Sequence, residues 1–156
     1  MEITEKIKSF EDACHALGIE TEEQLPALLQ SKYADIVPSH IKAELKLEII
    51  TKALNEGWDH FPDGKHFAYW PWFEFFTVEE IAKHSEAWAK EYSIIDATDV
   101  SDVYAGLGCA ASSYAWSGSH SDVGSRLAYK SSALAKYSGR QFVELWKEYL
   151  LIPIIR

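Results

Sequence analysis

Arg126 and Lys130 are the residues of this chain whose type and spacing best suit recognition of a charged ligand. They lie in an alternating stretch, residues 123–130, which predicts a β-strand because side chains two apart in a strand share a face. Leu127 and Tyr129 would then be buried on the apolar face. The two cations would share the opposite, more accessible face.

A helix start directly follows these cations. Ser131 or Ser132 is expected to cap it, which leaves free backbone N–H groups and the positive end of the helix dipole close to Lys130. This arrangement suits a phosphate or a carboxylate. The sequence therefore predicts an anion-binding site whose members are Arg126, Lys130, Ser125, Gly124 and Ser131. The alternative is that both cations belong to a solvated face and pair with acids of neighbouring strands.

An aromatic stretch over residues 66–76 predicts a second strand, in which Pro71 indicates a bulge or an edge position. Both faces of this strand are apolar. Trp70 and Trp72 are therefore either core or interface residues, or they stack with Tyr69 on the planar ring of a ligand.

The chain is acidic, with 15 Lys and Arg against 24 Asp and Glu and a net charge of −9. This balance argues against broad binding to nucleic acid or to an anionic membrane. The charge is unevenly distributed, because the segment 123–141 carries four cations and no acid: Arg126, Lys130, Lys136 and Arg140. A local cationic patch is expected within an acidic protein.

Other constellations give weaker signals, and no catalytic residue, metal site or cofactor is assigned. Cys14 and Cys109 lack metal-ligand spacing. The segment 59–66 holds two His and two Asp, but its Asp63-Gly64 pair is explained by a turn. His120, in the polar loop 117–122, has no nucleophile motif beside it. A small hydrolase using His120 or the segment 59–66 is the least favoured alternative.

The element pattern predicts one α+β domain over residues 1–156 with a small antiparallel sheet of three or more strands. Residues 1–57 are expected to be helical, with capping boxes at Ser9 and Thr21 and a long helix after Pro38. Residues 58–156 are expected to supply the sheet and a C-terminal helix over about 132–151, in which Gly139 marks a close approach to the sheet. Further strands are predicted within 103–116, and a helix over 77–92. No stretch approaches the length of a transmembrane helix, and the N-terminus has no signal-peptide pattern.

Several segments together resemble a family of small uncharacterised proteins from phages and prophages of gut Bacteroides-type bacteria. They are the Ser9-Phe10-Glu11-Asp12-Ala13-Cys14-His15-Ala16-Leu17-Gly18-Ile19 run, Ile50 to Trp58, Tyr69-Trp70-Pro71-Trp72-Phe73, Val123-Gly124-Ser125-Arg126-Leu127, Lys130-Ser131, and the helix with Leu134, Ala135, Tyr137, Gly139, Gln141 and Phe142. The helix over 77–92 departs from the shorter family pattern as an addition. The resemblance implies a phage protein in the cytoplasm of an infected bacterium, and it supplies no catalytic residues.

These observations favour a non-enzymatic protein that binds a small anionic, nucleotide-like molecule, such as a host immune signal that a phage would sequester. An alternative from another class is a protein-interaction or virion-associated module without a small-molecule ligand. In both cases the aromatic strand is expected to favour a homo-oligomer.

Overall fold

The computed structural model describes residues 1–61, 63–115 and 124–155. Its helices are α1 (Ile3–Lys6), α2 (Phe10–Ala16), α3 (Ser39–Asn55), α4 (Val78–Lys83), α5 (Glu86–Glu91), α6 (Ser132–Gln141) and α7 (Val143–Leu150), and its strands are β1 (Ala68–Phe76), β2 (Ile95–Asp96) and β3 (Gly106–Ala115). Short 3-10 helices lie at Glu22–Gln24, Ala27–Leu29, Ser31–Tyr33 and Ser125–Leu127. The predicted α+β class, with a small antiparallel sheet and N- and C-terminal helices, is confirmed.

Local signals set the helical boundaries of the first third. The Ser9 hydroxyl accepts the Asp12 N–H at 3.0 Å, and the Asp12 carboxylate accepts the Ser9 N–H at 3.0 Å, so the predicted capping box forms. The Thr21 box opens only a 3-10 helix. Helix α3 follows Pro38 as expected and ends where Glu56 and Gly57 adopt left-handed backbone angles, with φ of 51° and 88°.

The sheet is antiparallel, with strand order β1-β3-β2, so β1 is an outer strand. Trp70 pairs with Ser113 and Phe73 with Cys109, and the register shifts between Trp72 and Phe73. The edge position expected from Pro71 is therefore confirmed.

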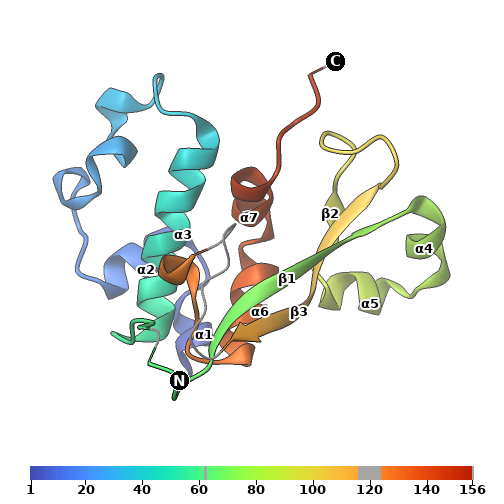
Figure 1. Cartoon of the computed structure of the whole chain (residues 1–156). Helices are drawn as coiled ribbons and strands as arrows, with labels where there is room; N and C mark the ends of the chain where they lie inside the picture. The colour runs from blue at the N-terminus through green and yellow to red at the C-terminus, as the bar shows by residue number, and fades with distance from the viewer. Residues whose placement is uncertain (62, 116–123, 156) are drawn as a thin grey trace.

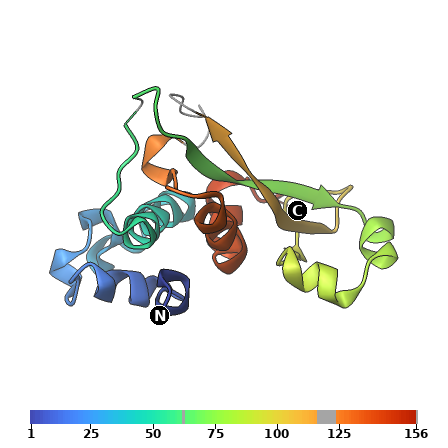
Figure 2. The same cartoon turned by 90° about the horizontal axis from the view of Figure 1, so that it is seen from below.

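Helices cover one side of this sheet (Figures 1 and 2). Helix α6 packs on β1 and β3, α7 packs beside α3, and α2 packs on α3. Helices α4 and α5 lie at the far end of the sheet, away from α3 (Figure 1). The main core lies among α2, α3, α6 and α7, with Tyr69 and Phe73 of β1 packed against it, and its largest fully buried side chains include Trp146, Tyr129, Leu47, Ile50, Leu54 and Leu127.

Gly139 lets α6 approach the sheet closely. A Cβ placed on Gly139 would lie 2.5 Å from the Cys109 Sγ and 2.8 Å from the Pro71 Cβ. The close approach predicted at this glycine is confirmed.

Several predicted elements are wrong in detail, among them the further strands expected within 103–116, where the described residues form the single strand β3. The helix expected over 77–92 is divided into α4 and α5, because the Ser85 hydroxyl accepts the Trp88 N–H and starts a new helix. The C-terminal helix is divided at Phe142, whose ψ of 30° interrupts it. The strand expected over 123–130 is replaced by the 3-10 helix at Ser125–Leu127 and an isolated bridge at Tyr129.

Candidate functional site

Residues 124–130 do not form a strand. They fold as a turn that lies in space between β1 and the end of α3. Tyr69 and Tyr129 exchange two backbone hydrogen bonds, of 3.0 and 2.8 Å, and this is the only ladder contact of the segment among the described residues. Leu127 and Tyr129 are buried as expected. Ala128, expected on the charged face, is also buried, because the 3-10 turn breaks the alternation. Val123 lies outside the described residues.

The two cations on which the predicted site depends are exposed, but each has a carboxylate from α3 beside it. The Lys130 Nζ lies 3.0 Å from the Glu56 Oε2. The Arg126 Nε lies 4.0 Å from the Glu48 Oε1. Partial burial raises the pKa of Glu48, and the Arg126 charge opposes that rise. Both cations thus belong to ion pairs, as in the alternative interpretation, although the acids come from a helix instead of a strand.

The neighbouring predicted site residues have structural partners. The Gly124 carbonyl accepts the Trp70 indole N–H at 2.9 Å. The Ser125 carbonyl accepts the Ala128 N–H. The Ser131 hydroxyl accepts the Leu134 N–H at 3.2 Å, so the expected cap of α6 is present.

The aromatic residues separate into core and surface. Trp70 is fully buried, in a small cluster with Ala68, Ala128 and Trp58. Tyr69 is partly buried and packs against the main core. Trp72 is 53% exposed. The structure therefore separates Trp72, on the surface, from the buried Trp70, and does not bring the three aromatics together as one platform.

A cationic hollow of about 610 Å³ lies instead along α6. We call it the α6 hollow, and it is lined by Ser93, Ser132, Ala133, Lys136, Tyr137, Arg140 and Gln141. Its lining contains two cations and no carboxylate. Within the described residues, neither Lys136 nor Arg140 forms an ion pair.

Ser132 and Ala133, in the first turn of α6, also line this hollow. The backbone N–H groups of Ser132 and Ala133 have no acceptor among the described residues, as expected for the first turn of a helix. The Ser132 hydroxyl lies 2.8 Å from that of Ser112. Ser132, Lys136 and Arg140 are four residues apart, so they form one stripe about 12 Å long on the helix.

Arg140 is held in place from two directions. Its Nε donates to the Cys109 carbonyl at 3.1 Å, and its guanidinium lies 5.3 Å from the centre of the Tyr92 ring. These contacts involve one nitrogen and one face, so the terminal nitrogens remain as donors. Cys109 lies beneath, and burial raises the pKa of its thiol to about 11 although Arg140 and Lys136 oppose the rise. This thiol is neutral at physiological pH and is a poor nucleophile.

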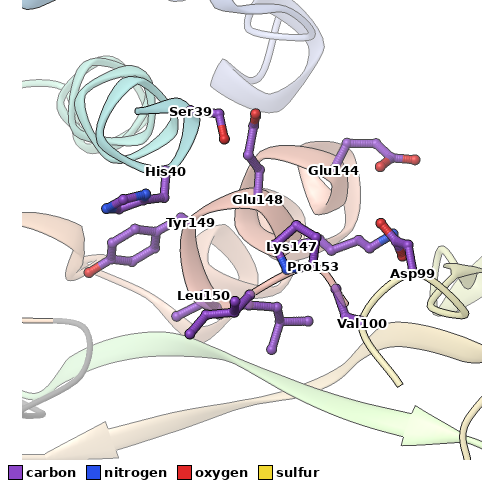
Figure 3. Close-up of a pocket in the computed structure, with 12 residues that line it drawn as sticks. Ser39, His40, Asp99, Val100, Glu144, Lys147, Glu148, Tyr149, Leu150 and Pro153 are labelled. Atoms are coloured by element: carbon purple, nitrogen blue, oxygen red, sulfur yellow. The ribbon is translucent and has the colours of Figure 1, made fainter. Parts of the chain in front are cut away.

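A second hollow, of about 830 Å³, has the opposite charge (Figure 3). It lies between the start of α3, α7 and the C-terminal segment, and Asp99, Glu144 and Glu148 line it with one lysine, Lys147. That lysine pairs with Asp99 at 2.6 Å (Figure 3). It also donates to the Asp96 carbonyl at 2.7 Å. Three acids against one cation make this hollow unsuitable for an anion. A third hollow, of about 560 Å³ beside α1 and α2, mixes both signs of charge.

The two histidines of the segment 59–66 contact other side chains of the protein. His66 pairs with Asp63 at 2.7 Å, and buried His60 stacks on Trp58 and meets Trp70 edge-on. Among the described residues, no cluster of three or more His, Cys, Asp or Glu side chains could hold a metal ion. His120 and the loop 117–122 lie outside the described residues.

Within the part of the chain that the structure describes, no helix has the length and apolarity needed to cross a bilayer. Comparison with protein-family models, curated proteins and solved structures gave no match. The resemblance to phage proteins therefore stays a prediction.

The sequence analysis identified the acid-free segment and assigned the site to Arg126 and Lys130; it assigned no role to Lys136 or Arg140, which line the α6 hollow. The missed signal is the spacing of Ser132, Lys136 and Arg140, which places three donors on one side of a capped helix.

Proposed function

We propose that this protein binds a small phosphorylated or otherwise anionic molecule, without converting it, in the α6 hollow. One observation carries the proposal: Lys136 and Arg140, which form no ion pair among the described residues, share a hollow with Ser132 and Ala133 of the first turn of α6. Helix N-termini and unpaired cations both favour bound anions.

The arrangement supports recognition at more than one point. The first turn and Arg140 lie eight residues apart, which is about 12 Å along the helix axis, and Lys136 lies midway. A compact anion would contact one end, whereas a molecule carrying two separated anionic groups would contact both. A mono- or dinucleotide has the required length and charge.

The proposal differs from the site first expected at Arg126 and Lys130, because those cations already have carboxylates within 4.0 Å. An anion there would compete with Glu48 and Glu56. In the α6 hollow it meets no acidic side chain of the lining, so binding requires no ion pair to break.

Titration calorimetry with inorganic phosphate, pyrophosphate and a panel of linear and cyclic nucleotides tests the proposal. Arg140→Ala and Lys136→Ala should each weaken binding about ten- to a hundredfold, since a charge-assisted hydrogen bond contributes about 1.5–3 kcal/mol. Arg126→Ala is the matched control and should leave the affinity unchanged. Chromatography of the mixture afterwards should recover the nucleotide intact.

Each contrary result has a defined meaning. Absence of heat with every anion would contradict the proposal. Loss of binding in Arg126→Ala but not in Arg140→Ala would return the site to the turn at residues 124–130. Altered nucleotide would identify an enzyme instead of a binding protein.

A further inference from the structure

The outer edge of β1 carries backbone groups that have no partner among the described residues. Tyr69 directs both its N–H and its C=O away from β3, toward Tyr129. In an antiparallel strand the residues two and four positions further on repeat this orientation. Cys109, the partner of Phe73, supports the same pattern, because its N–H donates to the Tyr92 carbonyl on the opposite side of β3. Phe73 and Phe75 therefore direct their backbone groups to the outer edge.

Within the described residues, no group donates to or accepts from Phe73 and Phe75 at that edge. Pro71 precedes them at the same orientation and offers only a carbonyl. An unpaired edge of this kind is a template for another strand.

Two polar side chains beside this edge also have no partner among the described residues. The Trp72 indole N–H has no acceptor, and the Glu74 carboxylate has no donor. Trp72 is 53% exposed, and Glu74 is exposed as well. Both lie on one face of β1, since they are two residues apart.

We propose that a second copy of this chain pairs with β1 antiparallel across a two-fold axis at Phe73. The two Phe73 residues then exchange two backbone hydrogen bonds, and each Phe75 N–H donates to the Pro71 carbonyl of the other copy. Trp72 of each copy lies directly opposite Glu74 of the other, at a position where Cβ atoms approach within about 5.5 Å. The Trp72 indole N–H of each copy can then donate to the Glu74 carboxylate of the other copy, which gives two such hydrogen bonds across the axis.

Charge selects this register over its neighbours. Moving the axis to Glu74 keeps four backbone bonds but places the two Glu74 side chains opposite each other, which is repulsive. Moving it to Trp72 leaves only the bonds from Phe73 to the Pro71 carbonyl, because Tyr69 is already paired with Tyr129. The occupant is therefore a second copy, since a single strand supplies both halves of the Trp72–Glu74 pair.

Sedimentation and light scattering of the full chain at micromolar concentration test the pairing, with twice 17.7 kDa as the expected mass. Trp72→Glu places like charges opposite each other and should weaken association by about tenfold or more. The exchanged variant Trp72→Glu/Glu74→Trp restores both pairs and should recover the dimer. Val103→Glu, an equal charge change at a side chain 70% exposed and outside β1, should have no effect.

Cysteine crosslinking reports the register directly. Trp72→Cys/Glu74→Cys should give a disulfide-linked dimer on a non-reducing gel, because directly opposite residues have Cα atoms within disulfide range. The native Cys14 and Cys109 are buried and provide no background. A monomer at these concentrations overturns the proposal, and so does a dimer that Trp72→Glu leaves intact.

Discussion

The Asn55 side chain bonds the backbone on both sides of Tyr129, at Lys130 and at Ala128. The Asn55 Oδ1 accepts the Lys130 backbone N–H at 3.1 Å, while its Nδ2 donates to the Ala128 carbonyl at 2.8 Å. Tyr69 holds the intervening residue, Tyr129, from the other side through two backbone bonds. The last turn of α3 and the edge of β1 thus clamp one short segment between them.

Asn55→Ala should destabilise the protein by about 2–4 kcal/mol, because two buried backbone groups lose their partners. Asn55→Asp should be similarly destabilised at neutral pH, since an ionised carboxylate cannot donate to the Ala128 carbonyl. Its deficit should shrink at acidic pH, where the protonated carboxyl regains a donor. Urea unfolding at both pH values measures this, and Lys130→Met, which loses only the surface pair with Glu56, should change stability by less than about 1 kcal/mol.

A buried chain of hydroxyls joins four elements around Tyr129. The Tyr129 hydroxyl lies 2.7 Å from the Thr51 Oγ1 and donates to the Ser138 Oγ at 2.6 Å, which also accepts the Trp146 indole N–H at 3.1 Å. Tyr129→Phe removes the centre of this chain and should cost about 1–3 kcal/mol. Tyr114→Phe is the matched control, because Tyr114 is 65% exposed and should show no change in chemical unfolding.

Alkaline pH should destabilise the protein because two buried side chains, the Tyr129 phenol and the Cys109 thiol, resist ionisation in the folded state. Burial raises the pKa of Tyr129 to about 12 from 10.0, and that of Cys109 to about 11 from 9.0. Because both folded-state pKa values lie above the unfolded ones, the stabilisation is complete below about pH 9 and is lost as the pH rises toward 12. The difference between the folded and unfolded pKa corresponds to about 3 kcal/mol for each group.

Urea midpoints measured across this range should fall steeply for the native chain. The double variant Tyr129→Phe/Cys109→Ala should be less stable at neutral pH but should show a flatter decline. Equal slopes in the two proteins would contradict the assignment.

Signals contained within a few residues predicted their elements correctly. The Ser9 cap, the start of α3 after Pro38 and the edge position of Pro71 each follow from local chemistry, and each is present. Ser85 is a residue type that favours a helix start, and its hydroxyl caps α5. The apolar residues on both sides of Ser85 nevertheless favoured one continuous helix over 77–92. The break at Phe142 has no comparable local signal.

The candidate site was harder to predict because contacts distant in sequence determine it. Residues 124–130 alternate like a strand, yet their conformation depends on Asn55, more than 70 positions away. Likewise, the docking of α3 places Glu48 and Glu56 beside Arg126 and Lys130, whereas no described acid pairs with Lys136 or Arg140. The amino-acid composition identified the cationic segment. Only the fold shows which of its cations form ion pairs among the described residues and which do not.

Gly139→Ala should destabilise the protein although alanine is the better helix former. The helix preference contributes about 1 kcal/mol in favour of alanine. Against it, the new methyl group would lie 2.5 Å from the Cys109 Sγ and 2.8 Å from the Pro71 Cβ, so α6 must move away from the sheet. Overpacking of this kind costs about 1–3 kcal/mol, and the net change should therefore be unfavourable. Adding Cys109→Ala removes the nearest atom and should recover part of the loss in urea unfolding, whereas a stabilised single variant would show that α6 and the sheet are not in close contact.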